Sequence, residues 1–321
     1  MTDRPLDVLC LGEALVDLLP ERRGRLRDCE RFSVHSGGAP ANVAVGLARL
    51  GSPVGFAGVL GDDEFGRLLE RKLQEEGVET HLRFTRESPT GAWFIALDEG
   101  GNRSFFSPSG AFSADKRVGP ADVGRAPLRS ARWLHCGSSS HVLPEGQEAL
   151  LAAVRAAEMC DTRVSFDPNV RPHLWTDPGE LRRLCLAAIP RCDLVKLSDE
   201  ECEAALGEPD PERAAARLAG MGVPLACITL GARGALLRRG HDVVRAPAPA
   251  VEVVDTTGAG DGFVAALLSR LARTGAPPPE EWTAQALEEA LRFACAVGSR
   301  VCTRLGAVAG LPRRDELAAG G

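Results

Sequence analysis

A glycine-rich segment, VVDTTGAGDGF at residues 253–263, holds a carboxylate at the point where a helix is expected to begin. Large apolar residues recur every fourth position from Phe263 onward, so we expect the helix to start near Gly258, after a β-like run VEVV that ends at Asp255. The first N–H groups of a helix have no intrahelical acceptor and carry partial positive charge. Alternate glycines let an anion approach these groups, so the segment predicts a hole for a phosphoryl group.

Asp261 lies inside this expected hole. A carboxylate there can accept the proton of an attacking hydroxyl while the neighbouring amides stabilise charge on the transferred phosphoryl group. We expect the helix dipole to lower the pKa of Asp261 and keep it ionised. The alternative is an acid that only stabilises the helix N-terminus, by about 0.3–1 kcal/mol. Three glycines in one turn, which cost roughly 1 kcal/mol each in a helix interior, favour the catalytic interpretation.

A second glycine-rich segment, SGGAPANVAVGLARLG at 36–51, also precedes an expected helix, and a proline near its first position is a start signal. Gly37 and Gly38 would leave room for a ligand, and the Asn42 amide could exchange hydrogen bonds with hydroxyl groups. Asp17, just after the first expected strand, could bind the same hydroxyls. An ordinary capped helix explains these residues without a ligand.

A dinucleotide-dependent oxidoreductase is a competing class, but its fingerprint is missing. GAGDGF reads G-x-G-x-G, not G-x-G-x-x-G, and it lies late in the chain. The turn after the first expected strand, in LCLGEALVD, contains a single glycine.

The rest of the chain alternates short apolar runs with longer amphipathic ones. The expected buried strands are 8–12, 54–57, 133–136, 164–167, 194–196 and 226–229. The expected helices are 40–50, 64–76, 145–160, 178–188, 199–206 and 212–221. This alternation predicts an α/β fold with one Rossmann-like, doubly wound sheet, in a single domain over residues 1–321.

Two segments break the alternation, at about 21–36 and 82–107. The first is polar and turn-like. The second resembles antiparallel strands joined by a turn at 99–102, where two adjacent glycines are a hairpin signal. We expect both to form a small β-sheet lid that projects near the ligand-binding end of the large sheet.

Charge, apolar runs and cysteine spacing limit the classes of partner and the cellular location that we expect. The net charge of −6 gives no reason to expect nucleic acid or an anionic membrane. No apolar run approaches the ~20 residues of a membrane span, and the N-terminus lacks the features of a secretory signal. The 10 cysteines contain no C-x-x-C pair, which favours free thiols in a reducing compartment, so we expect a cytoplasmic protein.

Together, GGAPANVAVGLARLG and VVDTTGAGDGF resemble the N-terminal and C-terminal signatures of the ribokinase/PfkB family of carbohydrate kinases. The likeness extends from CLGEALVDLLP to CTRLGAVAG, and implies a Rossmann-like sandwich, a β-sheet lid over the sugar, and the use of ATP and Mg²⁺. It implies that Asp261 is the catalytic base. It also implies an anion hole of Gly258, Ala259 and Gly260, and sugar-binding positions at Asp17, Gly37, Gly38 and Asn42.

The resemblance implies a monovalent-cation site as well. Its members would be the side chains of Asp255 and Thr257 and the carbonyl groups of Val301, Arg304 and Gly306. Gly310 stands where ribokinases have Ser, so activation by potassium is left open.

ITLGARGALL at 228–237 resembles the nucleotide loop of the family, although a hairpin with glycines at turn positions explains the same residues. KLSDEE resembles the segment whose acid, here Glu201, helps organise magnesium and phosphates. Ser198 is usual in fructokinase-like members, and Cys295 replaces an Asn common beside the adenine. The positions assigned to ATP are Asn169, Lys196, Ser198, Thr229, Gly231, Gly234, Gly260 and Cys295.

FDPNVRPHLW at 166–175 resembles the DPN-x-R-x-x-LW run of fructokinases and places Arg171 in a loop after a strand. GNRSFF presents Arg103 in the lid hairpin, a second fructokinase-like feature. Surface ion pairs are the alternative for both arginines. A keto-acid sugar kinase would also use arginines, to bind a carboxylate.

The sequence therefore predicts an ATP-dependent sugar kinase, most like a fructokinase that converts D-fructose to fructose 6-phosphate. The alternative within the family is 2-keto-3-deoxygluconate kinase or another sugar or nucleoside kinase. The alternative outside it is a catalytically silent sugar sensor, against which the retained Asp261 and glycines argue. The strand edges of the lid could pair two copies into a homodimer.

Overall fold

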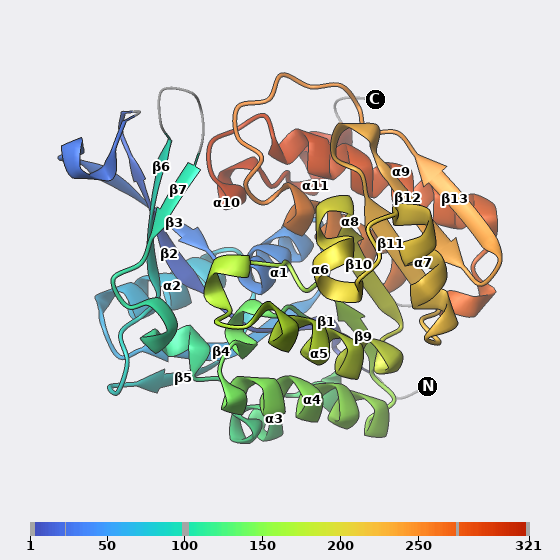
Figure 1. The fold of residues 1–321 in the computed structure, drawn as a ribbon, viewed down its shortest axis with the longest axis horizontal. Coiled ribbons are helices and arrows are strands. Elements are labelled where there is room, and N and C mark those ends of the chain that lie inside the picture. Colours follow the sequence, from blue (N-terminus) through green and yellow to red (C-terminus); the bar gives the residue numbers. More distant parts are fainter. Residues whose placement is uncertain (1–3, 23, 98–102, 274–275, 319–321) are drawn as a thin grey trace.

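The computed structural model describes residues 4–22, 24–97, 103–273 and 276–318. A nine-stranded sheet forms its centre (Figure 1). The strands are β1 (Leu6–Leu11), β4 (Val54–Gly61), β5 (Glu79–Thr85), β8 (Ala131–Cys136), β9 (Arg163–Phe166), β10 (Leu194–Ser198), β11 (Leu225–Thr229), β12 (Ala235–Arg239) and β13 (Asp242–Ala246). They lie in the order β13-β12-β11-β10-β9-β8-β1-β4-β5. Neighbours from β11 to β5 are parallel, and β12 and β13 add antiparallel strands at one edge.

Helices cover both faces of this sheet. They are α1 (Ala39–Arg49), α2 (Glu64–Glu75), α3 (Pro120–Arg125), α4 (Pro144–Met159), α5 (Pro178–Ala188), α6 (Cys202–Leu206), α7 (Pro211–Gly220), α8 (Ala259–Leu271), α9 (Ala284–Val301), α10 (Ala307–Gly310) and α11 (Arg314–Ala318). In β1, Leu9 and Leu11 join the core packed under α3 to α7, whereas Val8 and Cys10 join the core under α1, α2, α8 and α9. This two-sided burial confirms the doubly wound α/β fold. Within the described ranges, no helix has both the length and the hydropathy needed to cross a membrane.

A second sheet of four strands projects from the sandwich (Figure 1). Its strands are β2 (Leu15–Pro20), β3 (Phe32–Gly37), β6 (Ala92–Leu97) and β7 (Arg103–Phe106), in the order β3-β2-β6-β7. We call it the small sheet. β6 and β7 pair antiparallel, as the hairpin pattern predicted, and the expected turn at 99–102 lies outside the described residues.

The expected boundaries of the small sheet are wrong at two points. Residues 15–20 form its strand β2, so Asp17 lies within a strand of the small sheet. Only residues 12–14 separate β2 from β1, and for this reason the sequence of the two strands looks like one apolar run. Residues 82–85 belong to β5, which pairs with β4 at the edge of the large sheet. β5 is only half buried, so its mixed polar and apolar sequence looks like a separate surface sheet.

The prediction of a β-like run before α8 is also wrong. The chain is irregular from 247 to 258. Val253 and Val254 are 60% and 57% exposed, so these apolar side chains have no buried face to fill. The helix that follows begins at Ala259, next to the expected position.

Candidate active site

The N-terminal ends of α1 and α8 meet at the candidate site, where the two helices pack together (Figure 1). Gly46 permits this packing, because a Cβ at that position would lie 2.7 Å from the Cβ of Ala265. As a result Asn42, in the first turn of α1, reaches Asp261 in the first turn of α8, and its Nδ2 donates to Asp261 Oδ2 over 2.8 Å. The two glycine-rich segments therefore converge on one point.

The expected anion hole is the start of α8. Gly258 caps the helix with a φ of 80°, a conformation that favours glycine, and a side chain there would collide with α10. The Ala259 N–H donates to the Thr256 carbonyl over 3.2 Å. Gly260 and Asp261 follow in the first turn, where N–H groups have no acceptor within the helix. These residues lie together as expected, and their role in binding phosphate stays a prediction.

The carboxyl group of Asp261 is buried, with 8% of the residue exposed. Burial raises its pKa to about 6; the Asn42 hydrogen bond opposes this rise, Asp167 adds to it, and the cations Arg171 and Lys196 also oppose it. The expectation that the helix dipole lowers this pKa is wrong, because lost hydration of the carboxylate outweighs the dipole. A base with such a pKa is mostly ionised at pH 7 and still binds a proton readily.

The expected sugar-binding positions lie where the small sheet joins the sandwich. Asp17 in β2 packs against Gly37 at the end of β3, where a Cβ would collide with the Asp17 carboxylate. Gly38 has a φ of 103°, and a Cβ there would collide with the backbone of Glu13. Burial and then the charge of Asp261 raise the pKa of Asp17 to about 7, so the two carboxyl groups influence each other.

The loop after β9 carries Asn169 and Arg171. Asn169 has a φ of 47°, in the left-handed region, and its N–H donates to Asp167 Oδ1 over 3.1 Å. Arg171 is exposed and donates to two carbonyls of its own loop, over 3.4 and 3.2 Å. Within the described ranges it forms no ion pair. Its charge acts to lower the pKa of both Asp17 and Asp261, which places the guanidinium near the candidate site.

The small sheet contacts this loop through an aromatic pair. Trp93 of β6 lies edge-on to His173, with 5.5 Å between ring centroids. Trp93 is also the register partner of Asp17, so the contact helps hold Asp17 opposite the loop. Arg103 lies in β7, but its side chain is outside the described part of the chain, and its sugar-binding role stays a prediction.

A buried ion-pair cluster lies beside the start of α8. Lys196 Nζ is 3.0 Å from Asp167 Oδ2 and 3.8 Å from Glu201 Oε2. A Cβ on Gly260 would lie 3.4 Å from the same nitrogen. Burial opposes the charge on Lys196, but Asp167 and Glu201 outweigh it and raise the pKa, so the ammonium stays protonated. This ammonium lies beside the expected anion hole, and its charge is shared with the two carboxylates that it pairs with.

Backbone donors hold Glu201 in place. Its carboxylate accepts the Val170 N–H over 2.6 Å and the Ser198 N–H over 2.7 Å. Ser198 and Glu201 form a capping box at the start of the helical turn that follows β10. Because both carboxylate oxygens are engaged, Glu201 fits the indirect role toward magnesium that the sequence predicts.

The expected nucleotide loop follows β11. Thr229 ends this strand beside its register partner Ser198 at the end of β10. Gly231 and Gly234 have φ values of 57° and 94° in the turn between β11 and β12, so the antiparallel hairpin weighed as an alternative is present. A Cβ at Gly234 would collide with the Ala246 carbonyl, so the packing of this turn requires glycine with or without a nucleotide. Gly231 faces open space.

Cys295 lies buried on α9, with its Sγ 3.7 Å from the Ala246 carbonyl. Burial raises the pKa of this thiol to about 11, so it is protonated and unreactive. Gly234 and Cys295 thus pack against the same residue, Ala246, so two of the positions assigned to ATP lie close together.

The expected cation site is partly assembled. Asp255 Oδ1 accepts the N–H and the hydroxyl of Thr257 over 2.9 and 2.8 Å, and its Oδ2 accepts the Gly306 N–H over 2.8 Å. At the end of α9, the Arg304 N–H donates to the Val301 carbonyl over 3.4 Å.

Gly310 packs against the Val301 carbonyl, and any Cβ there would collide with it. The serine of ribokinases therefore does not fit this backbone.

Two acidic residues were missing from the predicted site. Glu13 follows β1 and is buried, and its carboxylate accepts the Ala39 N–H over 3.2 Å and the Ser140 hydroxyl over 2.8 Å. It therefore holds the start of α1. Asp167, the partner of Lys196, follows β9. Both acids lie within two residues of the end of a buried parallel strand, a position that signals a ligand-binding edge.

Comparisons with known proteins point to one family. Residues 5–314 match the family model described as pfkB family carbohydrate kinase. A fructokinase of Klebsiella pneumoniae is 40% identical over 312 residues, which cover 96% of each chain. A fructokinase structure from Xylella fastidiosa with bound ATP has a TM-score of 0.87 at 31% identity, covering 98% of this chain and 97% of that one. A fructokinase double mutant from Vibrio cholerae O395 with fructose, ADP and potassium ion bound has a TM-score of 0.87 at 32% identity, covering 99% of each chain.

Proposed function

Because the chain belongs to the pfkB family, it is a carbohydrate kinase, and we propose that it transfers the terminal phosphoryl group of ATP to the 6-hydroxyl of D-fructose. The Klebsiella pneumoniae relative and the two structures described above are fructokinases, which supports fructose as the sugar. One observation on the chain carries the proposal. A buried carboxylate, Asp261, is held by Asn42 at the glycine-rich start of α8, beside the ammonium of Lys196.

In the proposed reaction Asp261 accepts the proton of the hydroxymethyl group. The oxygen attacks the γ-phosphorus in line, a new P–O bond forms, and the bond to the departing ADP breaks. The N–H groups of Gly258, Gly260 and Asp261 and the Lys196 ammonium stabilise the charge on the phosphoryl oxygens. The proton then passes from Asp261 to solvent.

The sugar lies between the small sheet and the N-terminus of α1 in this proposal. Asp17 and Asn42 bind its hydroxyls, and Gly37 and Gly38 let the backbone lie close to Asp17 and Glu13, since a Cβ on either glycine would collide with those residues. Arg171 and Arg103 contact the sugar from the loop after β9 and from β7. Closure of the small sheet over the sugar excludes water from the transfer.

ATP lies along the carboxyl ends of β10 and β11 in this proposal. Thr229, Gly231, Gly234 and Cys295 line the nucleoside end. Asn169, Lys196, Ser198 and Gly260 line the phosphates. The proximity of Lys196 to Gly260 and the pairing of Ser198 with Thr229 support this arrangement.

Magnesium would come with the nucleotide. Among the described residues, no group of three His, Cys, Asp or Glu side chains could hold a metal ion, and magnesium in kinases is commonly bound through phosphates and one or two carboxylates. Glu201 would orient it through water. When bound, the ion neutralises charge on the β- and γ-phosphates.

A monovalent cation fits near the start of α8. The Asp255 carboxylate, the Thr257 hydroxyl and the carbonyls of Val301, Arg304 and Gly306 are the hard oxygen donors that such an ion prefers. The potassium ion in the Vibrio cholerae structure supports potassium as the ion.

A second candidate substrate is 2-keto-3-deoxygluconate. Arg171 forms no ion pair within the described ranges, so its guanidinium is available to a sugar carboxylate. The homodimer through the small sheet and the cytoplasmic location stay predictions.

The test is a set of initial rates of ADP formation with fructose, ribose, 2-keto-3-deoxygluconate and adenosine at equal concentrations. We expect kcat/KM to be highest for fructose. A higher value for the keto acid would establish the second candidate. ADP formation with none of them, while sugar binding persists in calorimetry, would establish the silent sensor.

A further inference from the structure

Only the nitrogen of the Asn42 side-chain amide has a hydrogen-bond partner among the described residues. Its Nδ2 donates to Asp261, but Oδ1 is buried and has no hydrogen-bond partner among the described residues. The whole residue is only 5% exposed, so bulk water does not supply the missing donor. A buried acceptor without a partner is unfavourable, and the side chain gains stability from any donor that can reach it.

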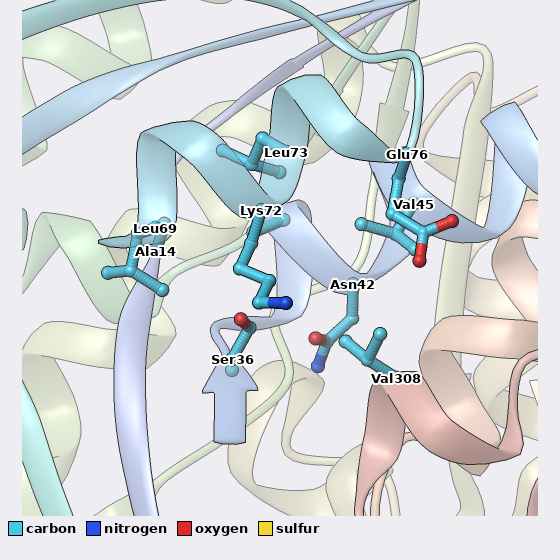
Figure 2. A pocket seen from close by; sticks show the side chains of 11 residues that line it. Ala14, Ser36, Asn42, Val45, Leu69, Lys72, Leu73, Glu76 and Val308 are labelled. Carbon is cyan, nitrogen blue, oxygen red and sulfur yellow. The ribbon is translucent and has the colours of Figure 1, made fainter. Parts of the chain in front are cut away.

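A cavity of about 40 Å³ adjoins Asn42 at the root of the small sheet (Figure 2). Most of its wall is apolar, from side chains of α1, α2 and α10. The polar residues on its wall include Ser36, Asn42, Lys72 and Glu76. Since one water needs roughly 10–15 Å³, the cavity has room for a bridging water.

Lys72 is the cation that faces this space. Figure 2 shows its ammonium and the Asn42 amide oxygen turned toward each other across the cavity. In α2, Glu75 Oε2 lies 3.2 Å from Lys72 Nζ, but both side chains are 52% exposed, and an ion pair of this kind contributes little. Lys72 can therefore exchange this partner for a buried one.

The other charged group on the cavity wall is already engaged. The Glu76 carboxylate accepts two hydrogen bonds from Arg49, over 3.0 and 2.6 Å, and a third from Arg313 over 2.9 Å. Arg49 also donates to the carbonyls of Val308 and Leu311, which fixes its position. Glu76 is therefore a weak competitor for the Lys72 ammonium.

We propose that Lys72 is a positioning residue for phosphoryl transfer, whose ammonium donates to Asn42 Oδ1 across the cavity, directly or through one water. An amide whose oxygen is tied to a cation cannot flip, so its Nδ2 stays directed at Asp261. Lys72 thus acts on the base through Asn42, without touching substrate. This inference rests on the proposed function, because it assumes that Asp261 is the base.

The test compares Lys72→Met with Arg71→Met. Arg71 is the matched control: it is next in α2, it pairs with the same Glu75 at 3.7 Å, it is 64% exposed, and it does not line the cavity. We expect Lys72→Met to lower kcat/KM for fructose about fivefold, the size of effect typical of one lost hydrogen bond, while Arg71→Met leaves it unchanged.

A pH profile separates positioning from simple destabilisation. Without Lys72 the Asn42 hydrogen bond weakens, and this bond opposes the raised pKa of Asp261. The acidic limb of kcat/KM therefore moves to higher pH in Lys72→Met. The other groups that act on Asp261, which are Asp17, Asp167, Arg171 and Lys196, are the same in both variants.

Lys72→Arg and Lys72→Gln complete the set. We expect Arg to restore both kcat/KM and the pH profile, and Gln, a neutral donor, to restore most of kcat/KM. Melting temperatures of all variants identify any that fail to fold, and Lys72→Ala, which also lacks a donor, replaces Lys72→Met in that case. If the variant that lacks a donor at position 72 matches Arg71→Met in both readouts, the positioning role is overturned. Failure of the wild-type enzyme on fructose is a separate result, which overturns the proposed substrate.

Discussion

The side chains of Asn42 and Asp261, 219 residues apart in the chain, are joined by a hydrogen bond of 2.8 Å. It connects the first turn of α1 to the first turn of α8 and supplies a donor to the carboxylate that we assign as the base. Because Asp261 is buried, this donor is one of the few groups that favour its ionised form.

Asp261→Asn should lower kcat by about 10²–10⁴-fold, because an amide cannot accept the proton of the sugar hydroxyl. Binding of ATP should stay near wild type, since the amide has nearly the same shape, whereas the melting temperature at pH 8 should rise, because the variant no longer buries a carboxylate whose pKa is raised. Initial rates and calorimetry check both statements. Asp242→Asn is the control, because that carboxyl is exposed at the start of β13 and pairs with Arg239. Turnover above a tenth of wild type would remove Asp261 from the role of base.

The pH dependence of kcat/KM should show an acidic limb near the pKa of Asp261, about 6. Activity needs the ionised carboxylate, so it falls as the pH drops through this value. Asn42→Ala removes a hydrogen bond that opposes the raised pKa, and the limb should move to higher pH. Gln285→Ala, an exposed amide change, should leave it in place. An unmoved limb in Asn42→Ala would show that another group sets it.

Asp17→Asn should stabilise the ligand-free protein at alkaline pH. The pKa of Asp17 is raised from 3.8 to about 7 in the folded state, so its ionisation is less favourable there than in the unfolded chain. Folded stability is therefore lost progressively as pH rises from about 4 to about 7, and the loss is complete above that range. The variant should melt about 2–5 °C higher at pH 8 and about equally at pH 4. Its KM for sugar should rise. Equal melting at pH 8 would contradict the burial of this charge.

Lys196→Met should lower the free energy of unfolding by about 3–5 kcal/mol, because it leaves Asp167 and Glu201 as buried carboxylates without a cation. Urea unfolding measures the change. Arg292→Met, which breaks the exposed pair with Glu288, should cost less than about 1 kcal/mol. Adding Asp167→Asn to Lys196→Met should recover part of the loss. Simple additivity of the two changes would argue against this pairing.

Potassium should raise the initial rate relative to an equal concentration of tetramethylammonium, and Asp255→Ala should abolish that difference. The expected reason is that Asp255 bonds to Thr257 and Gly306 and so fixes the loops at the start of α8. Glu252→Ala changes an exposed carboxyl in the same segment and should keep the response. A response that survives in Asp255→Ala would place the ion elsewhere.

Much of the site was predictable from local sequence because it depends on local backbone chemistry. Gly258 and Gly38 are at positive φ where helices begin, so glycine at these points signals both the turn and the space beside it. The parallel strands were predictable for a similar reason: a strand buried on both faces needs a short continuous apolar run. Boundaries failed for β2 and β5, where the neighbouring strand in space decides which sheet a segment joins.

By itself the sequence determined which residues could do the chemistry: a carboxylate in a glycine-rich helix start, a second such start with Asn42, and two signatures of one kinase family. Only the tertiary structure decided that Asn42 binds Asp261, that Lys196 lies beside Gly260, and that the pKa of Asp261 is raised and not lowered. The physical reason is that helix starts and turns are set by neighbours in the chain. Desolvation and charge pairing instead depend on which distant side chains are packed around a group.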